Sequence, residues 1–306
     1  MDFEIWILDF MIIGHQKQWG IFKKLAETGK LSHAYLFSGP EKLGKKKLAL
    51  ELLSLLFGKE LGEAVHPDFV FIGPTDGEIK ISQIRELSWR LSLKNLSAPF
   101  KGALIDNAHL MNFQAQTCLL KTLEEPRGKA ILILVTQYPQ TLLPTIISRC
   151  QTIKFYPVAG SEIENYLISK GLSEEKAKEI AEISLGRPGF ALDFLLKPEK
   201  IEEYRKAVSD VIKIANSDLA IRFQYAKKIS ENPAGSRFAG EILEIWLWYL
   251  RKVLISKIQG REDANFKNFS MSKLKNILQF GQRINFLATT QNINQRLALE
   301  NLMLEL

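Results

Sequence analysis

Short apolar runs alternate with amphipathic stretches through the first half of the chain. Runs of hydrophobic residues bounded by turn signals predict five strands, at residues 35–38, 69–72, 103–106, 130–135 and 152–155. Between them, apolar residues recur at the spacing of a helix. Strands that alternate with helices over about 150 residues predict a parallel, three-layer α/β domain.

The helical stretches also indicate buried faces and helix ends. The stretch before the first strand predicts an amphipathic helix with four apolar residues on its buried face: Ile21, Phe22, Leu25 and Ala26. A later helix is expected to open at Ser82, because serine is a preferred N-cap. The helix over residues 112–125 should stop near Glu125, since Pro126 restricts the residue before it and has no N–H to donate.

The strand pattern ends at Phe155. Three short amphipathic helices are predicted at residues 161–171, 173–186 and 188–196, and only helices from residue 199 onward. We therefore expect three domains: an α/β domain at residues 1–157, a small helical lid at 158–198 and an all-helical domain at 199–306.

Composition adds a few limits. A net charge of +7 favours a polyanion such as nucleic acid nearby, although a mildly basic surface is often only a solvated one. Cys118 and Cys150 cannot make a disulfide framework, so a reducing cytoplasm fits best. We expect no signal peptide, membrane span or metal site, because no apolar run approaches ~18 residues and the histidines stand apart. Met1 and Met11 both stay open as the start, and a start at Met11 would make the ten residues before it a mis-assigned extension.

A glycine-rich turn follows the first strand. Gly39 to Lys46 match the phosphate-binding loop G-x-x-x-x-G-K-[ST] up to its last position. Gly39 and Gly44 let backbone N–H groups turn toward phosphate oxygens, and Lys45 supplies a cation. The eighth position should hold Mg²⁺ through a hydroxyl, but here it is Lys46. The loop therefore suits a nucleotide and is damaged for catalysis, and ATP or ADP stays open as a ligand of this degenerate site.

Two further strands end on polar residues. Asp106 stands at the carboxyl end of a buried strand, where ligands of open α/β sheets bind, and Thr136 ends the next strand on the same crevice. The residue after Asp106 is Asn107, and an amide cannot serve as the general base that a glutamate supplies. Asp106 as a simple strand end, and Thr136 as a hydroxyl that satisfies backbone groups, remain the plainer alternatives.

Arginines near the domain edges are the remaining candidates. Arg149 stands just before the fifth strand, as a surface ion pair or as an arginine finger given to another subunit's nucleotide. Ser148 and Cys150 would then orient its turn. Cys150 is not expected to be redox-active or nucleophilic, because no histidine lies near it in sequence. Arg187, at the start of the third lid helix, is interpreted as an ordinary helix-start residue.

Seven segments together resemble a known family. They run from Ile12 to the last residue: IIGHQKQ, HAYLFSGPEKLGKKKLAL, HPDFVFI, IKISQIREL, LLKTLEEP, LLPTIISRC and INQRLALENLMLEL. The chain resembles the δ′-type clamp-loader subunits of bacterial DNA polymerase III, and more broadly the clamp-loader branch of the AAA+ proteins. The combination of LLKTLEEP with a following SRC is the specific part of this resemblance.

The resemblance implies a fold and residue roles. The expected fold is an AAA+ phosphate-loop module with a five-stranded parallel sheet, a helical lid and a C-terminal helical collar through which a pentameric loader assembles. Arg149 matches the family's trans-acting arginine, flanked by Ser148 and Cys150. Four residues match nucleotide-site positions: Gly39, Gly44, Lys45 and Asp106.

Departures from the family pattern narrow the function. Lys46 replaces the metal-binding hydroxyl, Asn107 the catalytic glutamate and Gly189 the lid-helix arginine of a motor subunit. The zinc-binding cysteine cluster of many relatives is missing, because only Lys59 to Val65 separate Gly58 from His66. These departures favour a non-hydrolysing δ′ subunit over an ATP-hydrolysing γ/τ motor subunit.

The resemblance also implies partners: γ/τ and δ subunits, and, through the complex, the sliding clamp and primed DNA. Two other functions stay open. One is an active γ/τ-type ATPase that tolerates unusual residues, and the other is a standalone DNA-binding AAA+ protein.

Overall fold

The computed structural model describes residues 12–58, 61, 66–125, 129–231, 235–261, 263–290 and 293–306. The chain divides into two compact units, Met1–Leu192 and Asp193–Leu306. The expected division into three domains stays a prediction. The alternative start at Met11 and the role of Pro126 lie outside the described residues.

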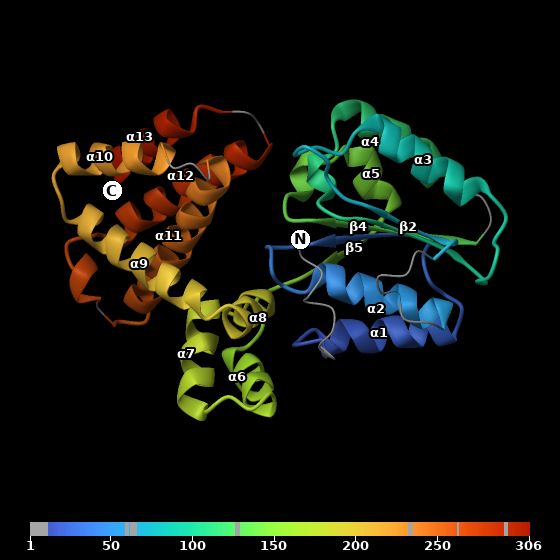
Figure 1. The fold of residues 1–306 in the computed structure, drawn as a ribbon, viewed down its shortest axis with the longest axis horizontal. Helices are drawn as coiled ribbons and strands as arrows, with labels where there is room; N and C mark the ends of the chain where they lie inside the picture. Colours follow the sequence, from blue (N-terminus) through green and yellow to red (C-terminus); the bar gives the residue numbers. More distant parts are fainter. Residues whose placement is uncertain are drawn as a thin grey trace. The chain divides into compact units, whose positions relative to one another are not determined.

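The first unit contains a five-stranded parallel sheet (Figure 1). The strands follow the order β2-β3-β4-β1-β5, and their bounds are β1 Ala34–Ser38, β2 Phe69–Ile72, β3 Lys101–Ile105, β4 Ala130–Thr136 and β5 Gln151–Lys154. Every pairing between neighbouring strands is parallel. The five predicted strands are therefore confirmed, with bounds that differ by a few residues. Because the strands are parallel, the residues that follow β1, β3 and β4 lie at one edge of the sheet.

Helices cover both faces of the sheet, as the three-layer prediction requires. Figure 1 shows α1 (Gln16–Glu27) and α2 (Lys45–Phe57) on one face. The other face carries α3 (Ile81–Ser92), α4 (Phe113–Glu124) and α5 (Pro144–Arg149). Two short 3₁₀ helices, η2 (Ala108–Leu110) and η3 (Pro139–Thr141), follow β3 and β4. The domain thus has the α/β architecture that the alternating pattern predicts.

Alternation along the strands builds two cores. Tyr35 and Phe37 of β1 face the core beneath α1 and α2, whereas Leu36 faces the core beneath α3 and α4. In β4, Ile133 and Leu134 divide in the same way. Successive side chains of a strand point to opposite faces, so a continuous apolar run fills both layers.

Two local expectations are wrong. Ile21 is exposed, because Phe22 takes the buried position of α1 and packs its ring against Tyr35 and Phe37. The third helix opens at Ile81 and not at Ser82, since the Gln83 side chain accepts a hydrogen bond of 2.8 Å from the Lys80 N–H. The expected stop near Glu125 is confirmed, because α4 ends at Glu124.

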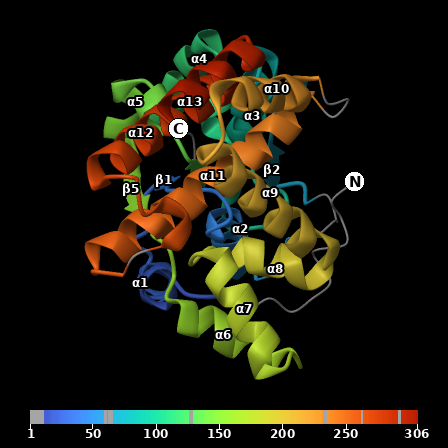
Figure 2. The same cartoon turned by 90° about the vertical axis from the view of Figure 1, so that its left-hand side faces the viewer.

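The rest of the described chain is helical. The first unit continues with α6 (Gly160–Ser169) and α7 (Glu174–Ser184), and α8 (Pro188–Leu196) begins within it. The second unit holds α9 (Glu199–Ala215), α10 (Leu219–Ser230), α11 (Gly235–Ile258), η4 (Ala264–Phe266), α12 (Met271–Thr290) and α13 (Gln295–Glu305), and Figure 2 labels its α-helices. This agrees with the predicted helical C-terminal part.

Trp246 is the centre of the second unit's core. It is almost completely buried, its indole N–H donates to the Ala207 carbonyl at 2.9 Å, and its ring stacks on Tyr225. The Tyr225 hydroxyl in turn donates to Asp210 at 2.7 Å. A core with its polar atoms paired lets this helical unit hold its shape around one aromatic centre.

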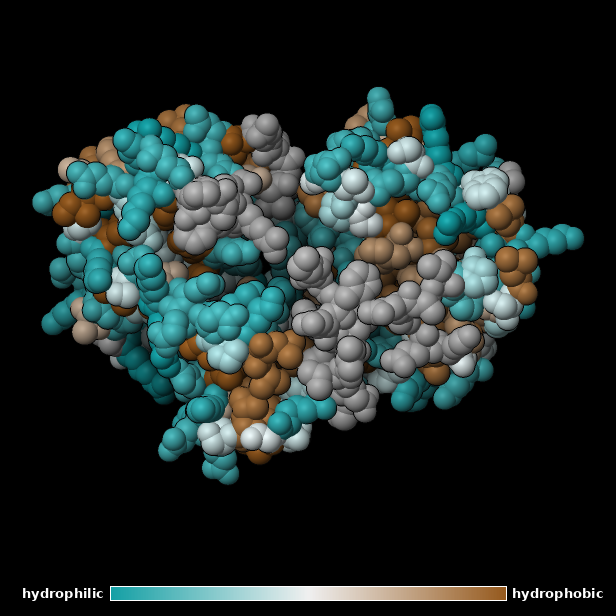
Figure 3. Space-filling model, in the orientation of Figure 1, coloured by the Kyte–Doolittle hydropathy of each residue, from teal (hydrophilic) through white to brown (hydrophobic). Residues whose placement is uncertain are grey.

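The surface is mixed. On the face drawn in Figure 3, hydrophobic residues occur in small groups among hydrophilic ones. Among the described residues, no helix combines the length and the hydrophobicity of a membrane-spanning segment.

Candidate functional site

The phosphate loop lies between β1 and α2, at the edge of the sheet where the strands end. Gly39 and Gly44 have φ of 146° and 84°, a region that side chains disfavour and glycine tolerates. A Cβ on Gly39 would lie 2.4 Å from the Phe155 carbonyl oxygen, so this position has no room for another residue. The Gly39 N–H donates to the Thr136 carbonyl at 3.2 Å, which ties the loop to β4.

Lys45 begins α2 and is only 6% exposed. Its ammonium donates to the carbonyls of Gly39 and Pro40 at 2.6 and 2.5 Å. Burial lowers the pKa of Lys45 to about 8; the carboxylates of Glu41 and Asp106 oppose this shift, and the charge of Arg187 adds to it. Because an ammonium has three N–H donors, two bonds to the loop leave one for a phosphate oxygen. The loop and Lys45 therefore fit a phosphate group.

Lys46 stands at the loop position that supplies a metal-binding hydroxyl in the complete motif. Its ammonium lies 3.3 Å from Oδ2 of Asp106, and 4.6 Å from the centre of the Phe71 ring. The other carboxylate oxygen, Oδ1, accepts the Asn107 N–H at 3.0 Å. Mg²⁺ in such loops uses the hydroxyl of the eighth residue and the strand-end aspartate. Here the first is replaced by a cation and the second is bound to it, so these residues do not fit Mg²⁺.

Thr136 lies at the same edge and is completely buried. Its hydroxyl accepts the Tyr138 N–H at 3.1 Å and lies 3.3 Å from Nδ1 of His109. Burial, with a contribution from the charge of Lys45, lowers the pKa of His109 to about 4. The imidazole is therefore neutral at pH 7 and adds no charge to an edge that is already rich in cations.

The start of α8 contacts the phosphate loop. The Gly189 N–H donates to the Lys42 carbonyl at 2.8 Å, and a Cβ on Gly189 would lie 2.9 Å from that oxygen. Arg187, just before the helix, is only 3% exposed, and its guanidinium lies 5.2 Å from the Phe190 ring centre. Glycine at 189 thus permits a close approach that brings the charge of Arg187 toward Lys45.

Arg149 lies elsewhere. It ends α5 and precedes β5, so it lies at the edge of the sheet where the strands begin, opposite the phosphate loop. Its guanidinium forms an ion pair of 2.7 Å with Glu124 and donates to the Thr145 carbonyl at 3.0 Å. The side chain keeps 35% of its surface exposed. The guanidinium is held in place on the surface of its own unit.

The two neighbours of Arg149 differ. Ser148 is exposed, and its hydroxyl donates to the Thr145 carbonyl at 3.1 Å. Cys150 is buried among the apolar residues beneath α4 and α5, and this burial raises the pKa of its thiol to about 12. Both side chains support the turn by packing and hydrogen bonding.

The predicted residues thus form two groups. Five of them meet at the edge where the strands end: Gly39, Gly44, Lys45, Asp106 and Thr136. Arg149, Ser148 and Cys150 form a separate surface turn. The structure adds His109 and Arg187 to the first group. The sequence offered only a weak signal for them, a lone histidine and a polar residue before a helix. In the described parts of the chain, no group of His, Cys, Asp or Glu residues could hold a metal ion.

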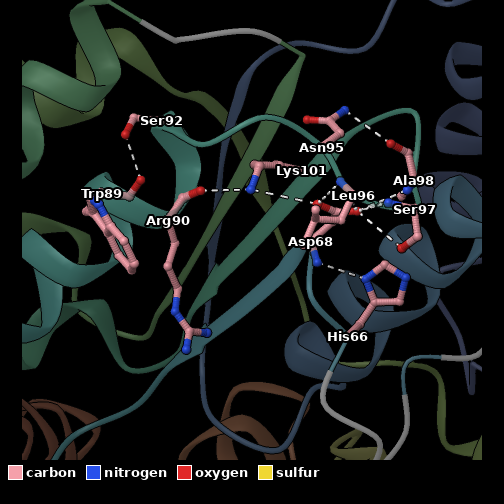
Figure 4. Close-up of polar contacts among 10 residues, drawn as sticks. All are labelled: His66, Asp68, Trp89, Arg90, Ser92, Asn95, Leu96, Ser97, Ala98 and Lys101. Carbon is pink, nitrogen blue, oxygen red and sulfur yellow. Dashed lines mark hydrogen bonds and ion pairs between the residues drawn. The ribbon is translucent and has the colours of Figure 1, made fainter.

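A second polar cluster, at the start of β2, has a structural role (Figure 4). Asp68 is 1% exposed and accepts hydrogen bonds from the backbone N–H groups of Leu96, Ser97 and Ala98 and from the Ser97 hydroxyl. Lys101 lies 3.7 Å from its carboxylate. Burial alone would raise the pKa of Asp68, but these hydrogen bonds outweigh it and lower the pKa to about 2. Through these hydrogen bonds the carboxylate stabilises the conformation of the loop between α3 and β3.

Comparisons with known proteins agree with this architecture. Residues 14–159 match the family model described as DNA polymerase III, delta subunit. The chain is 37% identical to DNA polymerase III subunit delta' of Bacillus subtilis over 172 residues, which cover 52% of each protein. It is 32% identical to subunit tau of the same organism over 153 residues, 44% of this chain and 26% of tau. The chain thus spans about half the length of the delta' relative that it matches.

A solved structure shows the fold. The crystal structure of a DNA polymerase III gamma subunit-related protein from Thermotoga maritima superimposes with a TM-score of 0.52, at 18% sequence identity, and the match covers 92% of this chain and 97% of that one. The chain therefore shares the fold of that structure, a parallel α/β domain followed by a helical C-terminal part.

The similarity in sequence is more specific than the similarity in fold. Residues 14–159 are similar in sequence to subunits of DNA polymerase III. Two of these relatives, from Bacillus subtilis and Pseudomonas aeruginosa, are delta' (δ′) subunits, 37% and 30% identical to this chain over about half of their length.

Proposed function

We propose that this chain is a non-hydrolysing δ′-type subunit of a DNA polymerase III clamp loader in the cytoplasm. It assembles with γ/τ and δ subunits and gives Arg149 to the ATP site of a neighbouring subunit. Through the complex it helps to load the sliding clamp on primed DNA during replication. Its own phosphate loop does not hydrolyse ATP.

The contact between Lys46 and Asp106 carries the proposal. A metal-dependent ATPase needs the strand-end carboxylate for its metal, and here a lysine ammonium lies 3.3 Å from that carboxylate. The next residue, Asn107, cannot accept a proton from water at neutral pH, and loss of a general base typically reduces the rate about 10²- to 10⁴-fold. The two changes act on different requirements of the reaction, so their effects multiply.

The position of Arg149 supports its action on another subunit. It lies at the edge of the sheet opposite the phosphate loop, so it cannot reach the nucleotide site of its own chain. Its guanidinium is partly exposed and is oriented by Glu124 and Thr145. An arginine held in one orientation loses less conformational freedom when it meets a phosphate on a neighbour.

The second unit supports assembly. Large apolar side chains remain exposed on its helices: Leu219, Ile221, Ile255, Ile258, Leu297 and Leu304. Exposed apolar residues on an otherwise well-packed helical unit suit contacts with other chains. This supports the collar role that the resemblance implies.

Reconstitution of the loader with its γ/τ and δ partners tests the arginine. Arg149→Ala should leave the size of the complex unchanged and reduce ATP turnover at the neighbouring site, where an arginine finger typically contributes about 10³- to 10⁵-fold. Arg149→Lys should recover little of this ATP turnover, because an ammonium lacks the planar arrangement of N–H donors that a guanidinium has.

Arg90→Ala is the matched control. Arg90 forms a surface ion pair with Glu86 in the same unit, and its side chain is 40% exposed against 35% for Arg149. Turnover that is unchanged in Arg149→Ala, or reduced equally in Arg90→Ala, contradicts the arginine-finger role.

The similarity to the tau subunit favours a second candidate, an ATP-hydrolysing γ/τ-type motor. The pairing of Lys46 with Asp106 argues against it. An ATPase assay of the purified chain with Mg²⁺ separates the two functions, since steady hydrolysis by the chain alone requires the motor assignment.

A further inference from the structure

The residues around this phosphate loop do not fit Mg²⁺, and this restricts the form of the ligand that the loop can bind. We infer that the loop takes a polyphosphate anion without a divalent cation, with the Lys46 ammonium, paired with Asp106, in the place of the metal. This rests on the part of the proposed function in which the chain does not hydrolyse ATP, and it deepens that part by naming the ligand form.

The anion-binding parts of the loop are intact. Gly39 and Gly44 keep the backbone conformations that turn N–H groups toward a phosphate, and α2, a helix of 13 residues, begins at the loop. Lys45 is buried beside them with two of its three donors on loop carbonyls. An anion at this position can accept the third donor.

The charge around the loop is positive. Lys45 and Lys46 belong to α2, and the buried Arg187 immediately precedes α8; of the two carboxylates that act on Lys45, Glu41 and Asp106, the second is already paired with Lys46. The repulsion between Arg187 and Lys45 contributes to the lowered pKa of Lys45. A polyphosphate relieves this repulsion, whereas a bare divalent cation adds to it.

The Lys46 ammonium can contact Asp106 and a bound anion at the same time. Its side chain is 40% exposed, so an anion can reach the ammonium while the contact with Asp106 persists. In metal-dependent loops one cation bridges the strand-end carboxylate and the outer phosphates. The Lys46 ammonium has donors for a carboxylate and a phosphate at once, but it carries one charge where the metal carries two.

Lys47 provides a matched control. It is the next residue of α2, but its ammonium pairs with Glu51 at 2.6 Å, one turn along the same helix. Substitution of either lysine removes one positive charge near the loop. Only substitution of Lys46 removes the cation from Asp106.

The test is equilibrium binding of two probes, a fluorescent ATP analogue and inorganic tripolyphosphate, to the full chain. Each is titrated in EDTA and in excess Mg²⁺. For the unsubstituted chain, affinity in EDTA should equal or exceed affinity in Mg²⁺, because Mg²⁺ neutralises the anion. Lys46→Thr restores the hydroxyl and frees Asp106, so Mg²⁺ should tighten its binding by about tenfold or more. Lys47→Thr should behave as the unsubstituted chain.

Lys45→Ala should weaken both probes in both buffers, and circular dichroism confirms that each variant is folded. Equal affinity for both probes would show that the loop recognises the phosphates alone. Tighter binding of the ATP analogue would show that the chain also contacts the nucleoside. The inference is overturned if the unsubstituted chain binds neither probe at millimolar concentration, if it requires Mg²⁺, or if Lys46→Thr matches Lys47→Thr. Failure here is distinguishable from failure of the proposed function, because the role of Arg149 is measured by turnover of the reconstituted loader and the lack of hydrolysis by the ATPase assay of the purified chain.

Discussion

Asp68→Asn tests whether the buried carboxylate holds the loop between α3 and β3. The substitution keeps the shape of the side chain but removes its charge, and it places an NH₂ group among N–H donors. In the structure these donors are the backbone N–H groups of Leu96, Ser97 and Ala98, at 2.8 to 3.1 Å. The substitution also removes the charged partner of the buried Lys101, whose ammonium still donates to the Arg90 carbonyl at 2.8 Å.

Two independent estimates bound the loss of stability. The pKa of Asp68 is lowered from 3.8 to about 2, and such a shift corresponds to about 2 kcal/mol at pH 7. Removal of one partner from a buried ion pair typically costs about 3 to 5 kcal/mol. We expect about 3 kcal/mol, because Asn can still accept some of the bonds. For a unit of this size that lowers Tm by roughly 6–12 °C.

The pH dependence follows from the sign of the shift. Because the pKa is lower in the folded state, the charged form stabilises the fold at every pH above the unfolded value, and the contribution is lost as pH falls from about 4 toward 2. The difference between the unsubstituted chain and Asp68→Asn should therefore be constant from pH 8 to 5 and narrow below pH 4.

Urea unfolding measures the global loss, and hydrogen exchange of the 93–99 segment measures the local one. Exchange at Leu96, Ser97 and Ala98 should accelerate about 30- to 150-fold, the equivalent of 2 to 3 kcal/mol. Asp76→Asn removes an exposed carboxylate that pairs with Lys80 and should change stability by less than about 0.5 kcal/mol. A loss below about 1 kcal/mol, or a difference that persists unchanged to pH 3, refutes the reasoning.

Two further predictions concern the phosphate loop and the cysteines. Gly39→Ala should destabilise the chain by about 3 kcal/mol in thermal unfolding, because its φ of 146° is strained for alanine and the new Cβ would meet the Phe155 carbonyl. Gly20→Ala, within α1 and with open space around it, should stabilise by about 0.5–1 kcal/mol, and a similar loss in both variants would contradict the reason given. In a thiol titration of the native chain Cys118 should react and Cys150 only after unfolding, because burial raises the Cys150 pKa to about 12; fast reaction of both thiols refutes this.

The fold could be predicted from the sequence wherever the signal was local. Each strand is a short apolar run, and continuous runs such as residues 130–135 are typical of strands buried on both faces. The two local errors arise from competition between neighbours. At Ile21 and Phe22 two apolar residues compete for one buried face, and at Ser82 and Gln83 a glutamine that reaches back fixes the start of the helix.

The residues of the candidate site could likewise be predicted from the sequence only where the signal was local. Asp106 and Thr136 could be expected at one edge, because the ends of parallel strands lie together. Arg187 could not be expected beside Lys45, since its position depends on how the start of α8 packs against the loop. His109 reaches Thr136 through the turn of η2, and no periodicity in the sequence indicates that turn.

Lys46 and Lys47 show why a motif alone does not determine chemistry. They are identical residues at adjacent positions, and the sequence indicates only that the first stands where a hydroxyl is expected. Successive residues of a helix point about 100° apart, so one lysine is directed at the end of β3 and the other along the surface of α2. The first meets Asp106 at 3.3 Å and the second meets Glu51 at 2.6 Å. The same cation therefore blocks a metal site in one case and forms an ordinary surface pair in the other. The helix phase set by Gly44, where the loop ends, decides between them.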